Sequence, residues 1–192
     1  ALHPLLRPLY RLRRCLPARE LGLRSLLIRL GLARYSAPSR MPRNLARMTF
    51  LEVLRRRGLR CHAIEVPGYN EERNEFFRSA LDKGHINKKR LANLAFLESE
   101  RRVKVAMGLL DEGVDVLMLY LFIPDIIHHL DRGSIHDTLR LHRAYWLCDR
   151  WTAQLKEHVG DGVCLIVSDH GFSRKTGYHT PHGFWLSLIH IS

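Results

Sequence analysis

Two short apolar runs constrain the fold of this chain more than any other feature of its 192 residues. The first run is VDVLMLYLFI, Val114–Ile123, and the second is VCLIVSD, Val163–Asp169. Nearly continuous apolar runs of this length are typical of strands in a parallel sheet, because helices cover both faces of such a sheet. Both runs are therefore predicted to be buried strands.

Segments of helical character alternate with these strands. Three segments have apolar residues at roughly helical spacing, and they are Met48–Gly58, Asn87–Leu110 and His136–Leu155. In the last of these, Leu139, Ala144, Trp146, Leu147 and Trp151 are candidate buried residues. A further strand is predicted at Leu59–Gly68, where Pro67 and Gly68 end it. This order predicts an α/β fold with a mostly parallel sheet flanked by helices on both faces.

The first third of the chain differs from the rest in charge. Residues 1–60 contain fifteen Arg, no Lys, and only Glu20 and Glu52, a formal balance of +13. The remaining 132 residues hold 16 basic and 17 acidic side chains, a balance of −1. We interpret 1–47 as an Arg-rich helical segment and linker, loosely anchored, and 48–192 as the α/β domain. The arginines favour either solvated amphipathic helices or a surface that contacts a polyanion or an acidic membrane.

Cysteine usage and hydropathy bear on the compartment. The four cysteines are scattered and form no CxxC pair, so no disulfide framework is indicated. The longest apolar stretch is far shorter than the roughly 20 residues of a membrane span, and no signal-peptide pattern is visible. These features predict a cytoplasmic protein.

Residues that can bind metal follow both predicted buried strands. Asp125 and His129 lie four residues apart, so a helical turn would place both on one face. Asp169 and His170 end the second strand, and His179 and His182 follow shortly after. Because ligands bind beyond the carboxyl ends of parallel strands, these side chains are candidates for one centre. Spacing alone does not choose His129 over His128, or His179 over His182.

Three separated motifs resemble a known family. VSDHGF followed by GYHTPHGFW resembles the C-terminal signature of the alkaline phosphatase superfamily, S-D-H-G and G-x-H-x-P-x-G, which Gly177, His179, Pro181 and Gly183 fill. LYLFIPDIIHHL resembles the strand and D-x-x-x-H motif of its type I phosphodiesterase/nucleotide pyrophosphatase branch. FLEVLRRRGLRCHAIEVPGYN resembles its helix, glycine, strand and Pro-Gly element, so the resemblance covers about residues 48–185.

The resemblance implies a ligand set and an activity. Asp125, His129 and His179 would form one metal site, and Asp169 and His170 would contribute to a second. Two divalent ions are expected, usually zinc with manganese possible, acting with a Ser or Thr nucleophile on a small phosphoester or nucleotide-like substrate.

One part of the family pattern is missing. The family supplies a further metal-binding Asp and the nucleophile ahead of the Met48–Gly58 element, but residues 1–47 contain no Asp. The nucleophile is therefore expected upstream of Ala1, and the chain is expected to be the back part of a longer hydrolase that is inactive alone. The alternatives are a phosphomutase or sulfatase relative, and a non-catalytic anion-binding module that uses the Arg-rich third.

Overall fold

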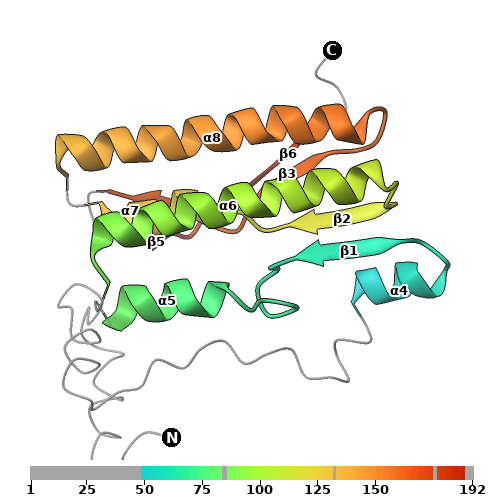
Figure 1. Cartoon of the computed structure of the whole chain (residues 1–192), viewed down its shortest axis with the longest axis horizontal. Coiled ribbons are helices and arrows are strands. Elements are labelled where there is room, and N and C mark those ends of the chain that lie inside the picture. Colours follow the sequence, from blue (N-terminus) through green and yellow to red (C-terminus); the bar gives the residue numbers. More distant parts are fainter. Residues whose placement is uncertain (1–48, 84–85, 132, 175–176, 189–192) are drawn as a thin grey trace, which may run out of the picture. The chain divides into compact units, whose positions relative to one another are not determined.

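The structure, a computed structural model, describes residues 49–83, 86–131, 133–174 and 177–188 (Figure 1). These residues belong to the unit formed by Arg40–Ser192. The described helices are α4 (Phe50–Arg56), α5 (Asn74–Lys83), α6 (Lys88–Asp111), α7 (Ile123–Leu130) and α8 (Ile135–Val159). The strands are β1 (Cys61–Ile64), β2 (Val116–Leu119), β3 (Leu165–Ser168), β4 (Gly171–Ser173), β5 (Tyr178–Thr180) and β6 (Phe184–Ser187). The predicted helical segment at 1–47 lies outside the described residues.

β1 and β2 form a parallel pair. Cys61 lies opposite Val116 and Ile64 lies opposite Leu119, with α5 and α6 in the connection between the strands (Figure 1). A connection of this length is what parallel strands require, because the chain must return to the starting edge before the second strand begins. The described chain is thus of mixed α/β character, as predicted.

The predicted third strand pairs differently. β3 pairs antiparallel with β6, and β4 pairs antiparallel with β5, so the described strands form three two-stranded sheets. The described strands therefore do not form the mostly parallel sheet that was predicted to contain β1, β2 and β3. Leu165 and Val167 are 60% and 71% exposed, so β3 is not covered on both faces as its apolar sequence predicted. No β3 residue belongs to the main cluster of buried apolar side chains among the described residues, a cluster that comes chiefly from the helices.

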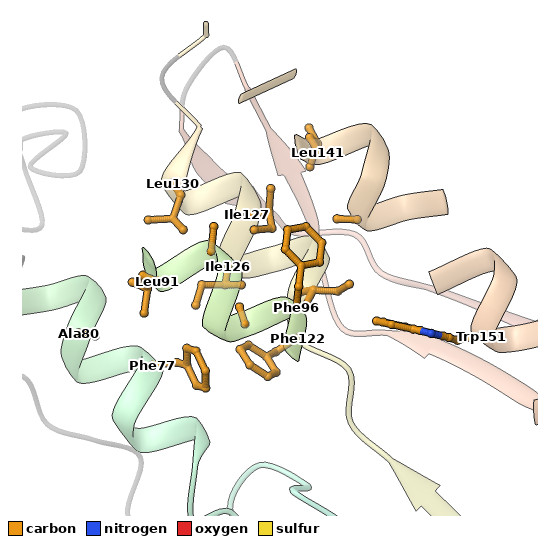
Figure 2. Packing of buried hydrophobic residues seen from close by; sticks show 14 of the residues in the cluster. Phe77, Ala80, Leu91, Phe96, Phe122, Ile126, Ile127, Leu130, Leu141 and Trp151 are labelled. Carbon is orange, nitrogen blue, oxygen red and sulfur yellow. The ribbon is translucent and has the colours of Figure 1, made fainter. Parts of the chain in front are cut away.

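The hydrophobic core lies among helices α5 to α8. Figure 2 shows Phe77 of α5, Leu91 and Phe96 of α6, and Trp151 of α8 around the side chains of α7. The buried residues of α7 recur with helical spacing, and they are Ile123, Ile126, Ile127 and Leu130. Burial of a side chain of this size stabilises the fold by about 1.5–3 kcal/mol. The short helix α7 is therefore held in place by its apolar face.

A buried ionic network connects α6 with the ends of β1 and β2. Arg102 has no exposed surface, and its guanidinium bonds to Glu98 Oε1 at 3.1 Å, to Asn74 Oδ1 at 2.8 Å and to the Tyr120 carbonyl at 3.0 Å. Glu65, the residue after β1, lies 3.6 Å from the same guanidinium. The Glu65 carboxylate also accepts hydrogen bonds from backbone N–H groups at the start of α5. The backbone of Glu65 has a φ of +54°, which is unusual for a non-glycine residue.

The ionisation of Glu98 follows from this network. Burial raises the pKa of the Glu98 carboxyl, but hydrogen bonds from Arg101 and Arg102 outweigh burial and hold this pKa below its usual value. Because the Glu98 pKa is lower in the folded chain, the ionised Glu98 carboxylate stabilises the fold at neutral pH. This stabilisation is lost as the pH falls below the ordinary value of 4.5.

The starts of α4, α6 and α8 agree closely with the predicted helical segments. The length of β2 and the exposure of side chains in α8 agree less well with the predictions. Thr49, Asn87 and Ser134 are N-caps whose side chains accept backbone hydrogen bonds. The predicted strand Val114–Ile123 is shorter, because α7 already begins at Ile123. In α8, Ala144 and Trp151 are buried as predicted, but Leu139 and Trp146 are more than half exposed. Among the described helices, none combines the length and the hydropathy needed to cross a membrane.

Replacing Arg102 by Ala is expected to destabilise the fold by about 3–5 kcal/mol, because it removes the buried cation beside Glu65 and leaves Glu98 with only its more exposed partners, Arg73 and Arg101. Urea denaturation followed by circular dichroism measures this loss. The control is Lys104→Ala, which removes an exposed pair with Glu100 and should cost less than about 1 kcal/mol. Equal losses for the two variants would show that the buried network contributes no more than a surface pair.

Candidate metal centre

Helix α7 presents two of the predicted ligands on the side away from the core. Pro124 lies in the first turn of the helix, where its missing N–H costs no hydrogen bond. Asp125 and His129 are one helical turn apart, with Asp125 Oδ1 3.5 Å from His129 Nε2. The turn that the D-x-x-x-H spacing required is therefore present, and it brings the carboxylate and the imidazole together.

His179 arrives from β5, fifty residues further along the chain. Its Nε2 atom lies 3.0 Å from His129 Nε2 and 3.1 Å from Asp125 Oδ1. Asp125, His129 and His179 form a cluster in which the three candidate ligand atoms all lie within 4.8 Å of one another. The structure thus brings together, from two separate motifs, the three residues predicted for the first metal site.

The spacing of these atoms fits a divalent ion. Ligand atoms bound tetrahedrally to zinc at about 2.0–2.1 Å lie about 3.3–3.4 Å from one another. The three observed separations, 3.0, 3.1 and 3.5 Å, fall close to this value. Two imidazole nitrogens and one carboxylate oxygen are also the donor set that zinc accepts in catalytic sites with an open fourth position. The three side chains are 34–41% exposed, so a substrate can reach them from solution.

Glycines allow the loop that carries His179 to approach the end of β3. A Cβ atom on Gly183 would collide with the backbone of Ser168 and Asp169. A Cβ on Gly171 would lie 2.5 Å from Thr180 Oγ1, on the opposite strand of the β4–β5 hairpin. Close packing between the two motifs therefore explains Gly171 and Gly183, whereas Gly177 is explained by its positive φ of +71°.

Asp169 and His170 lie beside this cluster and do not belong to it. The His170 ring stacks on the His179 ring, with centroids 3.6 Å apart and planes 13° apart. His170 Nε2 lies 3.7 Å from Asp169 Oδ1, and His170 Nδ1 lies 3.2 Å from the Gly171 carbonyl. An Nδ1–H bond to that carbonyl would leave the Nε2 lone pair available for an ion. These two residues can share an ion, but the structure shows no third ligand for it among the described residues.

Tyr120 links the two groups of ligands electrostatically. Burial, together with the negative charges of Asp125 and Asp169, raises the pKa of its phenol to about 12. The hydroxyl therefore keeps its proton at neutral pH and adds no negative charge beside the ligands.

The structure also distinguishes His129 from His128, and His179 from His182, which the sequence spacing could not do. His128 is buried, its ring stacks on Phe172 with centroids 4.6 Å apart, and its Nε2 lies 2.9 Å from the Tyr145 hydroxyl. Burial lowers its pKa, so it is a neutral core histidine. His182 is exposed and lies outside the cluster of three. His129 and His179 are thus the two imidazoles that meet.

Three further side chains near the cluster were not predicted from the sequence. Phe172 contacts the rings of His129 and His179, Tyr145 bonds to His128, and Arg174 forms an ion pair with Asp131. Phe172 follows the S-D-H-G motif directly, which is the only signal that could have identified it. Nothing in the spacing of Tyr145 or Arg174 pointed to the site.

Comparison with protein-family models, with curated proteins and with solved structures gives no match. Assignment to a family therefore depends on the three motifs and on the geometry of the cluster, and it is a proposal.

Replacing His128 by Ala is expected to destabilise the fold by about 1–3 kcal/mol, because the change removes a buried ring and leaves the Tyr145 hydroxyl without its partner. The matched control is His182→Ala, an exposed histidine ten residues from the end of the chain, which should change stability by less than about 0.5 kcal/mol. Urea denaturation in the presence of a chelator measures both. A loss from His182→Ala as large as that from His128→Ala would contradict the burial described here.

Proposed function

We propose that this chain provides the metal-binding part of a metal-dependent phosphoester hydrolase. The enzyme would belong to the alkaline phosphatase superfamily and resemble its type I phosphodiesterase/nucleotide pyrophosphatase branch. The observation that carries this proposal is the meeting of Asp125 Oδ1, His129 Nε2 and His179 Nε2 at separations of 3.0–3.5 Å. Two motifs far apart in sequence supply these atoms, and they are the residues that the resemblance assigns to one metal ion.

Asp125, His129 and His179 would hold one ion, and Asp169 and His170 would contribute to a second. Zinc suits the mixed carboxylate and imidazole donors, and manganese is the alternative. A bound divalent ion would polarise a phosphoryl oxygen of the substrate and stabilise its negative charge. The chain's own residues support this role in two ways. Their partial exposure admits an anionic substrate, and the Tyr120 phenol, whose pKa is raised to about 12, adds no negative charge that would repel it.

The remaining catalytic groups would come from outside this chain. The family's nucleophilic Ser or Thr and its additional metal-binding Asp would complete the second site. Further strands would extend the β1–β2 pair into the wide, mostly parallel sheet of such enzymes, and they would cover the exposed side chains of β3. A small phosphoester or nucleotide-like substrate and a cytoplasmic location belong to the same proposal.

Two alternatives can be distinguished experimentally. A phosphomutase or sulfatase relative would use the same ligands with another substrate, so assays of the longer protein on phosphodiesters, phosphomonoesters and sulfate esters separate these enzymes. An anion-binding module would act through the arginines of residues 1–47. Its binding to a polyanion would weaken steeply with salt, whereas metal binding would weaken as the histidines become protonated.

We expect this chain to bind about one zinc ion tightly, because three protein ligands suffice for a zinc site and two rarely do. Replacing His179 by Ala should abolish this tight binding, since only two of the three ligands remain. Metal analysis after dialysis against a weak chelator measures the stoichiometry.

The matched control is His182→Ala, which changes a histidine of the same loop and should retain the zinc. Loss of zinc from His182→Ala with retention in His179→Ala would show that the motif register is wrong. We also expect no measurable phosphodiesterase turnover from this chain by itself. Turnover that survives purification and disappears in His179→Ala would show that the chain already contains its nucleophile.

A further inference from the structure

The hairpin formed by β4 and β5 carries His179, yet among the described strands it hydrogen-bonds to no other strand. It continues from the β3–β6 pair, and its described contacts with α7 are made by side chains. Phe172 and His179 lie directly opposite each other on the hairpin. The Phe172 ring packs against His128 and His129, with ring centroids 4.6 and 5.2 Å away, so an aromatic contact holds one end of the hairpin to the helix.

Arg174, two residues beyond Phe172, makes the polar contacts of the same hairpin. Its Nε lies 2.7 Å from Asp131 Oδ2, and its Nη2 donates to Thr138 Oγ1 at 3.0 Å. Asp131 is the C-cap of α7, and Thr138 lies in the first turns of α8. One guanidinium thus joins three segments that are separate in the sequence.

Asp131, whose carboxylate pairs with Arg174, is held by a second contact as well. The Asp131 side chain is only 6% exposed, and its other oxygen accepts a hydrogen bond from the Gly133 N–H at 2.8 Å. An almost buried carboxylate depends on its cation, because losing the partner leaves an uncompensated charge. In this pair the carboxylate is almost buried, while the Arg174 side chain is 46% exposed. Arg140 and Asp137 have the same separation of 2.7 Å, but they are three residues apart in one helix and join no separate elements.

We propose that Arg174 is a positioning residue, which holds the β4–β5 hairpin on α7 and α8 so that His179 Nε2 stays beside Asp125 and His129. In the metal-free chain the three candidate ligands are all 34–41% exposed, so water competes for every one of their contacts. Arg174 is 46% exposed, but the carboxylate with which it pairs is only 6% exposed. Phe172 fixes the distance of the hairpin from α7, and Arg174 fixes its direction at the helix end. The consequence for metal binding rests on the proposed function, whereas the consequence for the hairpin itself does not.

The first test measures the hairpin without metal. In the metal-free full chain, Arg174→Ala should speed amide hydrogen exchange in β4 and β5 about tenfold or more, with exchange in β1 and β2 unchanged. Arg174→Lys should recover part of the protection, because an ammonium can still pair with Asp131 but cannot also reach Thr138 with the same geometry. Arg140→Ala is the matched control and should leave hairpin exchange as in the wild type.

Exchange in Arg174→Ala equal to that in Arg140→Ala would overturn the proposal. If Arg174→Ala does not fold, the same exchange measurement is made on Thr138→Val, which removes the hydrogen bond between Arg174 Nη2 and Thr138 Oγ1. A several-fold increase of hairpin exchange in that variant supports the proposal, and no increase overturns it.

The second test measures zinc. Arg174→Ala should weaken zinc affinity about 10- to 100-fold, as is typical when a residue that orients ligands is lost, with the same stoichiometry at saturation. The visible absorption spectrum of the Co²⁺-saturated chain should match the wild type, because the ligands themselves are unchanged. Arg174→Ala with wild-type zinc affinity would show that Arg174 does not position the ligands. A wild-type chain that binds no zinc would refute the proposed function, and the hydrogen-exchange result would still decide the role of Arg174.

Discussion

The guanidinium of Arg102 is the interaction on which the rest of this structure depends. It has no exposed surface, and it joins α6 to the residue after β1 and to the residue after β2. A buried cation is tolerated only where carboxylates and carbonyls surround it, so Glu65, Glu98 and the chain at Tyr120 must keep their relative positions. Because α7 begins three residues after Tyr120, this network also sets the start of the helix that carries Asp125 and His129.

The candidate centre then follows from the two faces of α7. Its isoleucines and Leu130 are buried among α5, α6 and α8, which fixes the rotation of the helix about its axis. That rotation directs Asp125 and His129 toward the hairpin that carries His179. Among the described strands, the β4–β5 pair hydrogen-bonds to no other strand, and the hairpin meets α7 and its C-cap through Phe172 and Arg174. The geometry of the cluster therefore depends on side-chain packing as well as on backbone hydrogen bonds.

The predictions from sequence succeeded where a local signal was strong and failed where distant partners decided. The helix within Met48–Gly58 was predicted from its apolar spacing, and the parallel pairing of the strands predicted at Leu59–Gly68 and Val114–Ile123 followed from the alternation of strands and helices. The length of the second strand was overestimated, because the apolar run continues beyond the end of β2 at Leu119 and its last residue, Ile123, already begins α7. The strand that pairs with β3 could not be predicted. An apolar run indicates that a strand has faces to bury, but it does not indicate which strand lies beside it.

The sequence by itself determined the residue types of the candidate centre and their order along the chain, and the D-x-x-x-H spacing already indicated that a helical turn would bring Asp125 and His129 to one face. Only the tertiary structure decided which histidines meet. His128 and His129 are adjacent in the chain, yet the rotation of α7 buries the first against Phe172 and turns the second toward His179. The physical reason is that a helix fixes the angle between neighbouring side chains, while the direction of the whole set is fixed only when its apolar face packs against the core.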